Sequence, residues 1–275
     1  MLTARVAGRD LGVKVWKFPC GETGVKIESC AERVLVGEVV KVILRWEGND
    51  DLVALAQLVD IVKNAGARAW TLLIPYFPYS RQDRRCSPGE AHALKVFCVM
   101  LNSLGFDLVT TYDAHSSVLE ALVDKLRVTP QEECAYNLPV HDVLVAPDAG
   151  AEKKVFKHYQ VADAAIGTKV LCASKVRDPE GKITGMRLPA QPFDIADKSV
   201  CVVDDLCDGG ATFLAVADAI RATARPSELN LYVTHGMFTK GYDALLSKYD
   251  IIFVQNLGMT APEVPECYTS RIRII

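Results

Sequence analysis

Several features of other protein classes are missing from this 275-residue sequence. No apolar run reaches the roughly 20 residues of a membrane-spanning helix, and Met1–Gly12 lacks the apolar core of a secretory signal. The nine cysteines are odd in number and contain no Cys-x-x-Cys pair, which argues against a disulfide framework and a zinc site. A net charge of -3 provides no overall basic field for nucleic acid. These absences predict a cytoplasmic protein with reduced thiols that binds neither membrane nor nucleic acid.

What is present is the pattern of a folded α/β protein. Apolar residues make up 50% of the chain and charged residues 24%, enough for a sizeable core. Continuous apolar runs alternate with helix-like segments, which predicts mainly parallel sheets covered on both faces. The expected strands are 39–44, 70–75, 108–112, 143–146, 200–203, 229–234 and 251–254, and the expected helices are 51–65, 91–104 and 211–224. The pattern falls into two sets, which predicts domains at 1–105 and 106–275.

The strongest chemical signal follows the expected strand 200–203. Residues 202–212 read Val-Val-Asp-Asp-Leu-Cys-Asp-Gly-Gly-Ala-Thr. Parallel sheets bind ligands at the C-terminal ends of their strands, and a glycine turn leading into a helix suits a phosphate. The carboxylates of Asp204 and Asp205 would repel phosphate but suit ribose hydroxyls, directly or through a divalent cation. A helix N-cap with two solvated acids is the alternative, but the diacid, the glycines and Thr212 together favour a phosphorylated ribose.

A second segment, residues 76–85, follows the expected strand 70–75 and reads Tyr-Phe-Pro-Tyr-Ser-Arg-Gln-Asp-Arg-Arg. Arginine guanidinium groups pair with phosphates, and aromatic rings can pack against a base. The segment therefore suits a nucleotide, with a solvated basic loop as the alternative.

Three shorter segments are also candidates. Asp113-Ala114-His115-Ser116 could bind a metal or orient a phosphate, although histidines in such places are more often structural. Pro147-Asp148-Ala149-Gly150 sets a strand-end carboxylate beside a glycine. Lys175-Val176-Arg177 precedes the residues 178–182, which predict a β-hairpin or flap. Its two cations could close over a transferring phosphoryl group or line a solvated edge strand.

Together these segments resemble the ribose-phosphate pyrophosphokinase (phosphoribosyl pyrophosphate synthetase) family. The stretch Pro75–Arg85 matches the family pattern Pro-Tyr-Phe-x-Tyr-x-Arg-Gln-Asp-Arg-Arg, and residues 202–212 match its sugar loop. Shorter matches follow in family order, at Phe18 with Gly21 and Glu22, Asp113 with His115, Pro147–Gly150, Lys175 with Arg177, and Thr234 with His235 and Phe238.

The resemblance implies two tandem type I phosphoribosyltransferase-like domains, each a mainly parallel sheet flanked by helices. It implies a homo-oligomer, a dimer or higher, that transfers the β,γ-diphosphate of Mg-ATP to the 1-hydroxyl of ribose 5-phosphate, giving phosphoribosyl pyrophosphate and AMP. The implied roles are ATP binding for Phe18, Glu22, Arg81, Gln82 and Arg84, catalysis for Lys175, Arg177 and His115, Mg²⁺ binding for His115 and Asp148, and ribose-phosphate binding for Asp204, Asp205, Asp208, Gly209, Gly210, Ala211 and Thr212.

The sequence also departs from the family pattern. Cys20 replaces an acid, and the phosphate loop reads Asp-Gly-Gly-Ala-Thr at 208–212 where Asp-Thr-Gly-Gly-Thr is common. Cys86–Glu90 replaces the basic stretch of the regulatory ADP and phosphate site, so we expect that regulation to be missing. The chain also stops at Ile275, before a further helix of longer members. These departures resemble compact, phage-like members.

Two alternatives therefore accompany ribose 5-phosphate. The first is the same diphosphate transfer to ADP-ribose, as in phage relatives that rebuild NAD, because the departures fall where the group on the 5-carbon would bind. The second is a catalytically silent partner of a synthetase. The retained charges of Lys175, Arg177, His115, Asp204 and Asp205 argue against silence.

Overall fold

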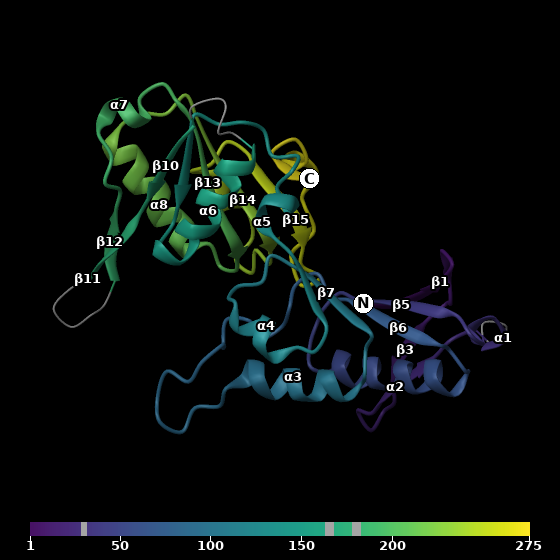
Figure 1. Ribbon diagram of the computed structural model, residues 1–275. Coiled ribbons are helices and arrows are strands. Elements are labelled where there is room, and N and C mark those ends of the chain that lie inside the picture. The colour runs from purple at the N-terminus through teal and green to yellow at the C-terminus, as the bar shows by residue number, and fades with distance from the viewer. Residues whose placement is uncertain (29–31, 163–167, 178–182) are drawn as a thin grey trace. The chain divides into compact units, whose positions relative to one another are not determined.

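The computed structural model describes residues 1–28, 32–162, 168–177 and 183–275. The chain forms two compact units, Met1–Thr129 and Pro130–Ile275 (Figure 1). The expected division lay earlier, between residues 105 and 106. The division by packing comes later because residues 108–129 add two strands to the first sheet, where they pair in parallel with its other strands.

The first unit is built on a six-stranded sheet in the order β2-β1-β5-β6-β7-β8. Its strands are β1 (Leu2–Val6), β2 (Arg9–Asp10), β5 (Val39–Leu44), β6 (Ala69–Leu73), β7 (Leu108–Tyr112) and β8 (Leu126–Thr129). The pairs from β5 to β8 are parallel, whereas β1 pairs antiparallel with both β2 and β5. Helices α2 (Asp50–Asn64) and α3 (Ala93–Ser103) bury their apolar residues in the same core as the strands.

A separate hairpin of β3 (Lys14–Lys17) and β4 (Thr23–Lys26) belongs to this unit. Every residue of β3 is exposed, which is why an apolar pattern did not predict it. The hairpin is attached through β4, because the Gln57 side-chain amide of α2 donates to the Thr23 carbonyl at 2.7 Å. An ion pair between Lys17 and Asp50 adds a second link to α2.

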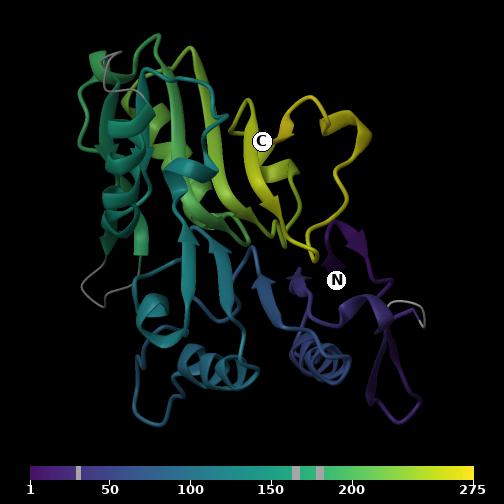
Figure 2. The same ribbon diagram turned by 45° about the vertical axis from the view of Figure 1, so that its right-hand side comes forward.

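The second unit contains a six-stranded sheet in the order β10-β9-β13-β14-β15-β16, in which all neighbours are parallel (Figure 2). Its strands are β9 (Val143–Ala146), β10 (Lys169–Cys172), β13 (Ser199–Cys207), β14 (Glu228–Gly236), β15 (Ile252–Leu257) and β16 (Ile272–Ile274). A hairpin of β11 (Ser174–Arg177) and β12 (Ile183–Arg187) stands at the expected flap.

Two helices cover opposite faces of the second sheet because strand side chains alternate between faces. Val200 and Val202 pack in one core with apolar residues of α8 (Ala211–Thr223). Cys201 and Val203 pack in another core with Ala151 and Val155 of α6 (Ala149–Ala162). The mainly parallel α/β fold expected from the sequence is confirmed.

Short elements complete the two units: α1 (Glu32–Leu35), α4 (Val118–Leu122), α5 (Gln131–Cys134), α7 (Pro192–Ile195), α9 (Asp243–Leu246) and a 3-10 turn at Glu266–Tyr268. Across the part of the chain that the structure describes, no helix is both long and apolar enough to cross a membrane.

Candidate active site

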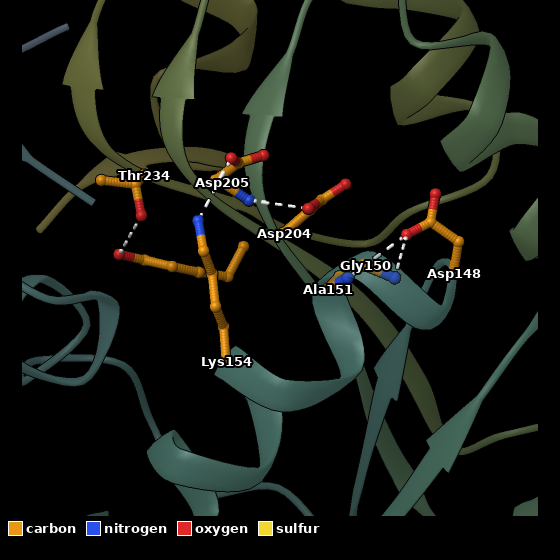
Figure 3. A network of polar contacts seen from close by, with 8 residues as sticks. Asp148, Gly150, Ala151, Lys154, Asp204, Asp205 and Thr234 are labelled. Atoms are coloured by element: carbon orange, nitrogen blue, oxygen red, sulfur yellow. Dashed lines mark hydrogen bonds and ion pairs between the residues drawn. The ribbon is translucent and has the colours of Figure 1, made fainter. Parts of the chain in front are cut away.

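The acidic pair, Asp204 and Asp205, lies inside β13. The sequence pattern had predicted that the strand ends before these residues. The pairing of β13 with β14 continues through Asp204↔Val233 to Cys207↔Gly236, so the strand runs past both carboxylates. By strand alternation, Asp205 continues the face of Cys201 and Val203, which α6 covers. The Asp205 backbone N–H donates to Asp204 Oδ1 at 2.9 Å, which turns the Asp204 carboxylate back toward its neighbour (Figure 3).

A cation from α6 reaches this pair. Lys154 Nζ lies 3.2 Å from Asp205 Oδ2, and the two side chains are only 25% and 9% exposed. Figure 3 shows Lys154 extending from α6 to the strand. Sequence reasoning did not find Lys154, because Lys153 and Lys154 read as ordinary helix-surface residues.

The charge balance at the strand end is negative. Burial of the Asp204 carboxyl, then the charge of Asp205 and that of Asp148, raise the pKa of Asp204 well above its ordinary value. Asp148 precedes α6, and its Oδ1 accepts the backbone N–H groups of Gly150 at 3.0 Å and Ala151 at 3.2 Å. The site therefore suits hydroxyl donors or a cation more than another carboxylate.

The turn after β13 opens directly into the N-terminus of α8. Gly210 is the N-cap, with a left-handed φ of 79° that glycine adopts without strain. The first backbone N–H groups of a helix have no partner within the helix and attract anions. The expected glycine turn before a helix is thus present, with Thr212 in the first helical turn.

Asp208 holds this turn to the neighbouring loop. Thr239 Oγ1 donates to Asp208 Oδ1 at 2.8 Å, and the Thr239 N–H donates to the Asp208 carbonyl at 3.1 Å. A side chain at Gly209 would begin 3.4 Å from the stem of Lys240. Asp208 therefore fixes the loop, and Lys240 brings an exposed cation beside it.

The arginine segment, residues 76–85 of the first unit, begins with mostly buried side chains and ends with mostly exposed ones. The Tyr79 ring packs against Trp46 at 6.2 Å and Phe97 at 5.5 Å between centroids. Arg81, Gln82 and Arg84 are exposed beyond it. Such an arrangement leaves the polar side chains accessible to a ligand.

Asp83 is a buried carboxylate that holds the Arg84 side chain, and the sequence pattern did not single it out. Arg84 Nε and Nη2 donate to its two carboxylate oxygens at 2.9 and 3.3 Å. The hydrogen bond from Arg84 lowers the pKa of Asp83 most, and Ser116 and the charge of His115 add to the effect against the opposing burial. The structure thus brings His115 near the arginine segment, which adjacency in sequence could not show.

Phe18 and Glu22 lie in the turn of the β3–β4 hairpin. The Phe18 N–H donates to the Glu22 carbonyl at 2.8 Å, and the Phe18 ring meets Trp16 edge-on at 5.7 Å. Both residues are exposed. The backbone of Lys175 and Arg177 lies in β11, but their side chains fall outside the described part of the structure.

The described residues do not form a metal site from protein side chains alone. Among them, no group of three or more His, Cys, Asp or Glu side chains is placed to hold a metal ion. His115 belongs to the first unit and Asp148 to the second, and each is described only within its own unit. Mg²⁺ is usually held by one or two carboxylates together with substrate phosphates, so Asp148 beside the acidic pair still fits that ion.

The fold and the acid–glycine turn at the strand end define an α/β protein of the phosphoribosyltransferase-like class. Residues 4–105 match the model of the N-terminal domain of ribose phosphate pyrophosphokinase. Ribose-phosphate pyrophosphokinase A of Dictyostelium discoideum is 28% identical over 82% of this chain and 70% of its own length. These matches support assignment of the chain to the ribose-phosphate pyrophosphokinase family.

Other relatives agree with this assignment. The ribose-phosphate pyrophosphokinase of Ureaplasma parvum serovar 3 is 28% identical over 69% of the chain, and the match spans 58% of that relative, less than two thirds of its length. The crystal structure of phosphoribosylpyrophosphate synthetase from Mycobacterium smegmatis has a TM-score of 0.77 at 19% identity, covering 96% of this chain and 85% of that one. This second likeness supports the fold.

Proposed function

We propose that the protein transfers the β,γ-diphosphate of Mg-ATP to the anomeric hydroxyl of ribose 5-phosphate. The observation that carries this proposal is the C-terminal end of β13 and the turn that follows it. There a partly buried acidic pair within the strand, a glycine turn and a helix N-terminus follow one another, in a chain whose residues 4–105 match the N-terminal domain of ribose phosphate pyrophosphokinase. Carboxylates accept sugar hydroxyls, and the helix N-terminus accepts the 5-phosphate.

In the proposed reaction the anomeric oxygen attacks the β-phosphorus of ATP. A new O–P bond forms, the bond from that phosphorus to the bridging oxygen of the α-phosphate breaks, AMP leaves, and the hydroxyl proton is released. No protein nucleophile is needed, since positioning and charge neutralisation can supply the catalysis.

The proposed residue roles are those that the resemblance to the ribose-phosphate pyrophosphokinase family implies. Asp204 and Asp205 accept the ribose hydroxyls, while Gly209–Thr212 with the α8 N-terminus bind the phosphate. Arg81, Gln82, Arg84, Phe18 and Glu22 bind ATP, and Lys175 and Arg177 neutralise charge on the transferring group. Asp148 and His115 would hold Mg²⁺, which neutralises phosphate charge when bound. The protein is proposed to work as a homo-oligomer.

ADP-ribose is a second candidate acceptor, favoured by Lys240. The Lys240 stem lies 3.4 Å from the place where a side chain at Gly209 would begin. Lys240 therefore sets an exposed cation beside the phosphate turn, residues 208–212. The diphosphate of ADP-ribose carries about the same charge as a terminal monophosphate at neutral pH, but spreads it over two phosphate groups, so its second phosphate would pair with that cation.

The test is AMP release from Mg-ATP, with ribose 5-phosphate and ADP-ribose offered separately. AMP with ribose 5-phosphate supports the first acceptor, and AMP only with ADP-ribose supports the second. If no AMP is released with either sugar, the result would contradict the proposed activity and favour a catalytically silent partner. As a control, Asp204→Asn with Asp205→Asn should lower turnover strongly, because the ribose hydroxyls lose their acceptors. Near-normal kinetics would remove the ribose assignment.

A further inference from the structure

Lys154 is the residue of the acidic network to which the proposed chemistry assigns no role. It lies on α6, outside the turn that would bind the sugar, yet its ammonium contacts Asp205 Oδ2 at 3.2 Å (Figure 3). Both side chains are mostly shielded from water, at 25% and 9% exposure. A pair in this setting is screened less by salt than a surface pair and keeps a more defined geometry.

The neighbouring charges explain why a cation is needed here. The charges of the adjacent Asp205 and of Asp148 both act on Asp204, so negative charge accumulates at this end of the strand. The Asp204 carboxylate is held by a backbone N–H, whereas the Asp205 carboxylate is held by Lys154. Removing Lys154 would leave a buried carboxylate without this counter-charge, and such a group turns away or takes up a proton.

We propose that Lys154 is a positioning residue for the sugar, which holds the Asp205 carboxylate in the orientation that accepts a ribose hydroxyl. This inference rests on the proposed function and adds to it a residue that acts through Asp205. The carboxylate has two oxygens and several lone pairs, so it can accept from Lys154 and from a hydroxyl together. Lys154 therefore supports sugar binding without touching the transferred diphosphate.

The first experiment compares Lys154→Met with the wild-type protein. A hydrogen bond to a charged group is worth about tenfold to a hundredfold in affinity, so the KM for the sugar should rise by about that factor. The KM for ATP should stay within about twofold, because the ATP-binding residues lie on other elements. Lys154→Arg should restore most of the sugar affinity, since guanidinium also pairs with carboxylate.

Lys153→Met is the matched control. Lys153 is the preceding residue of the same helix, and its side chain is exposed. The substitution removes one positive charge from α6 without reaching the acidic pair. We expect sugar and ATP KM values like those of the wild type.

A double-mutant cycle tests whether Lys154 acts through Asp205. In an Asp205→Asn background, Lys154→Met should change the sugar KM by no more than about twofold, because the partner charge is already gone. Equal effects of Lys154→Met in both backgrounds would overturn the inference. An unchanged sugar KM in Lys154→Met would overturn it as well, as would a parallel rise in the KM for ATP.

Failure of the proposed function can be told apart from failure of this inference. If the wild type releases no AMP with either sugar, the activity is contradicted, but calorimetric binding of ribose 5-phosphate to the wild type and the same variants still measures the affinity ratio. Wild-type binding that Lys154→Met leaves unchanged, or absence of wild-type binding, would overturn the role of Lys154. A Tm within a few degrees of wild type shows that each variant is folded.

Discussion

Asp204 carries a charge that the folded protein disfavours. Burial, then the charges of Asp205 and Asp148, raise its pKa above the ordinary 3.8. A carboxyl whose folded pKa is raised contributes stability below the unfolded pKa and loses it as the pH rises through the folded pKa. Asp204→Asn should therefore raise the Tm at neutral pH, by about 2–4 °C for each kcal/mol of repulsion removed. The gain should shrink as the pH falls toward 3.8.

Thermal unfolding followed by circular dichroism over this pH range checks the prediction. Asp218→Asn is a suitable control, because Asp218 is 61% exposed and pairs at the surface with Lys248. Surface pairs contribute little, so this control should give no pH-dependent gain. A neutral-pH Tm of Asp204→Asn at or below that of the wild type would show that the Asp204 charge is already compensated.

Single residues also show which parts of the candidate site could be predicted from the sequence. Asp204 and Asp205 could be predicted because the two acids, the glycines and the following helix are contiguous. Lys154 could not, since it lies 51 positions from Asp205 and meets it only when α6 covers the sheet. Asp83 lies inside the arginine segment, but its burial near Ser116 and His115 could not be read from the sequence, because those residues follow more than 30 positions later.

The start of α8 depends on Gly210. Its φ is 79°, and an added Cβ would lie 3.1 Å from the Leu245 side chain. A left-handed conformation costs a non-glycine residue roughly 1–2 kcal/mol. Gly210→Ala should lower the free energy of unfolding by about that amount and weaken sugar-phosphate binding, because the helix N-terminus must shift. Urea unfolding and calorimetric binding measure the two effects.

Gly209→Ala is the stability control for this element. The atoms nearest to its Cβ would be in the flexible stem of Lys240, from 3.4 Å, and its φ is not left-handed. The free energy of unfolding should change by less than about 0.5 kcal/mol. Equal losses of stability in both variants would show that the left-handed conformation of Gly210 is not the cause of the loss in Gly210→Ala.

Elements with continuous apolar cores were the most predictable. The expected strands 39–44, 108–112 and 143–146 coincide with β5, β7 and β9. The end of β13 was placed too early because carboxylates look like a strand terminus, while pairing with β14 carries the strand to Cys207. The β3–β4 hairpin was missed because its first strand buries no side chain and so leaves no alternating pattern.

At the scale of the whole molecule, each unit has its own core. One apolar cluster lies within Met1–Thr129, and two clusters on opposite faces of one sheet lie within Pro130–Ile275. The division by packing could not be read from alternation alone, because the strands at 108–112 and 126–129 continue the parallel pairing of the first sheet.

The proposed sugar site and ATP site therefore separate by unit. Asp204, Asp205, Lys154 and the phosphate turn all belong to residues 130–275, whereas the arginine segment belongs to residues 1–129. A separate 130–275 chain should fold cooperatively, because it keeps a complete sheet with both faces covered. It should bind ribose 5-phosphate within about tenfold of the full chain, since it retains the groups that accept the sugar. It should release no AMP, because the residues proposed to bind ATP are absent.

Circular dichroism, calorimetry and the AMP assay test these three expectations on one sample. Mixing in a separate 1–129 chain is the control for lost activity, since recovery of AMP release would show that both units are needed. If the 130–275 chain folds but binds no sugar, part of the sugar site must belong to the first unit. AMP release by 130–275 alone would contradict the assignment of ATP binding to the arginine segment.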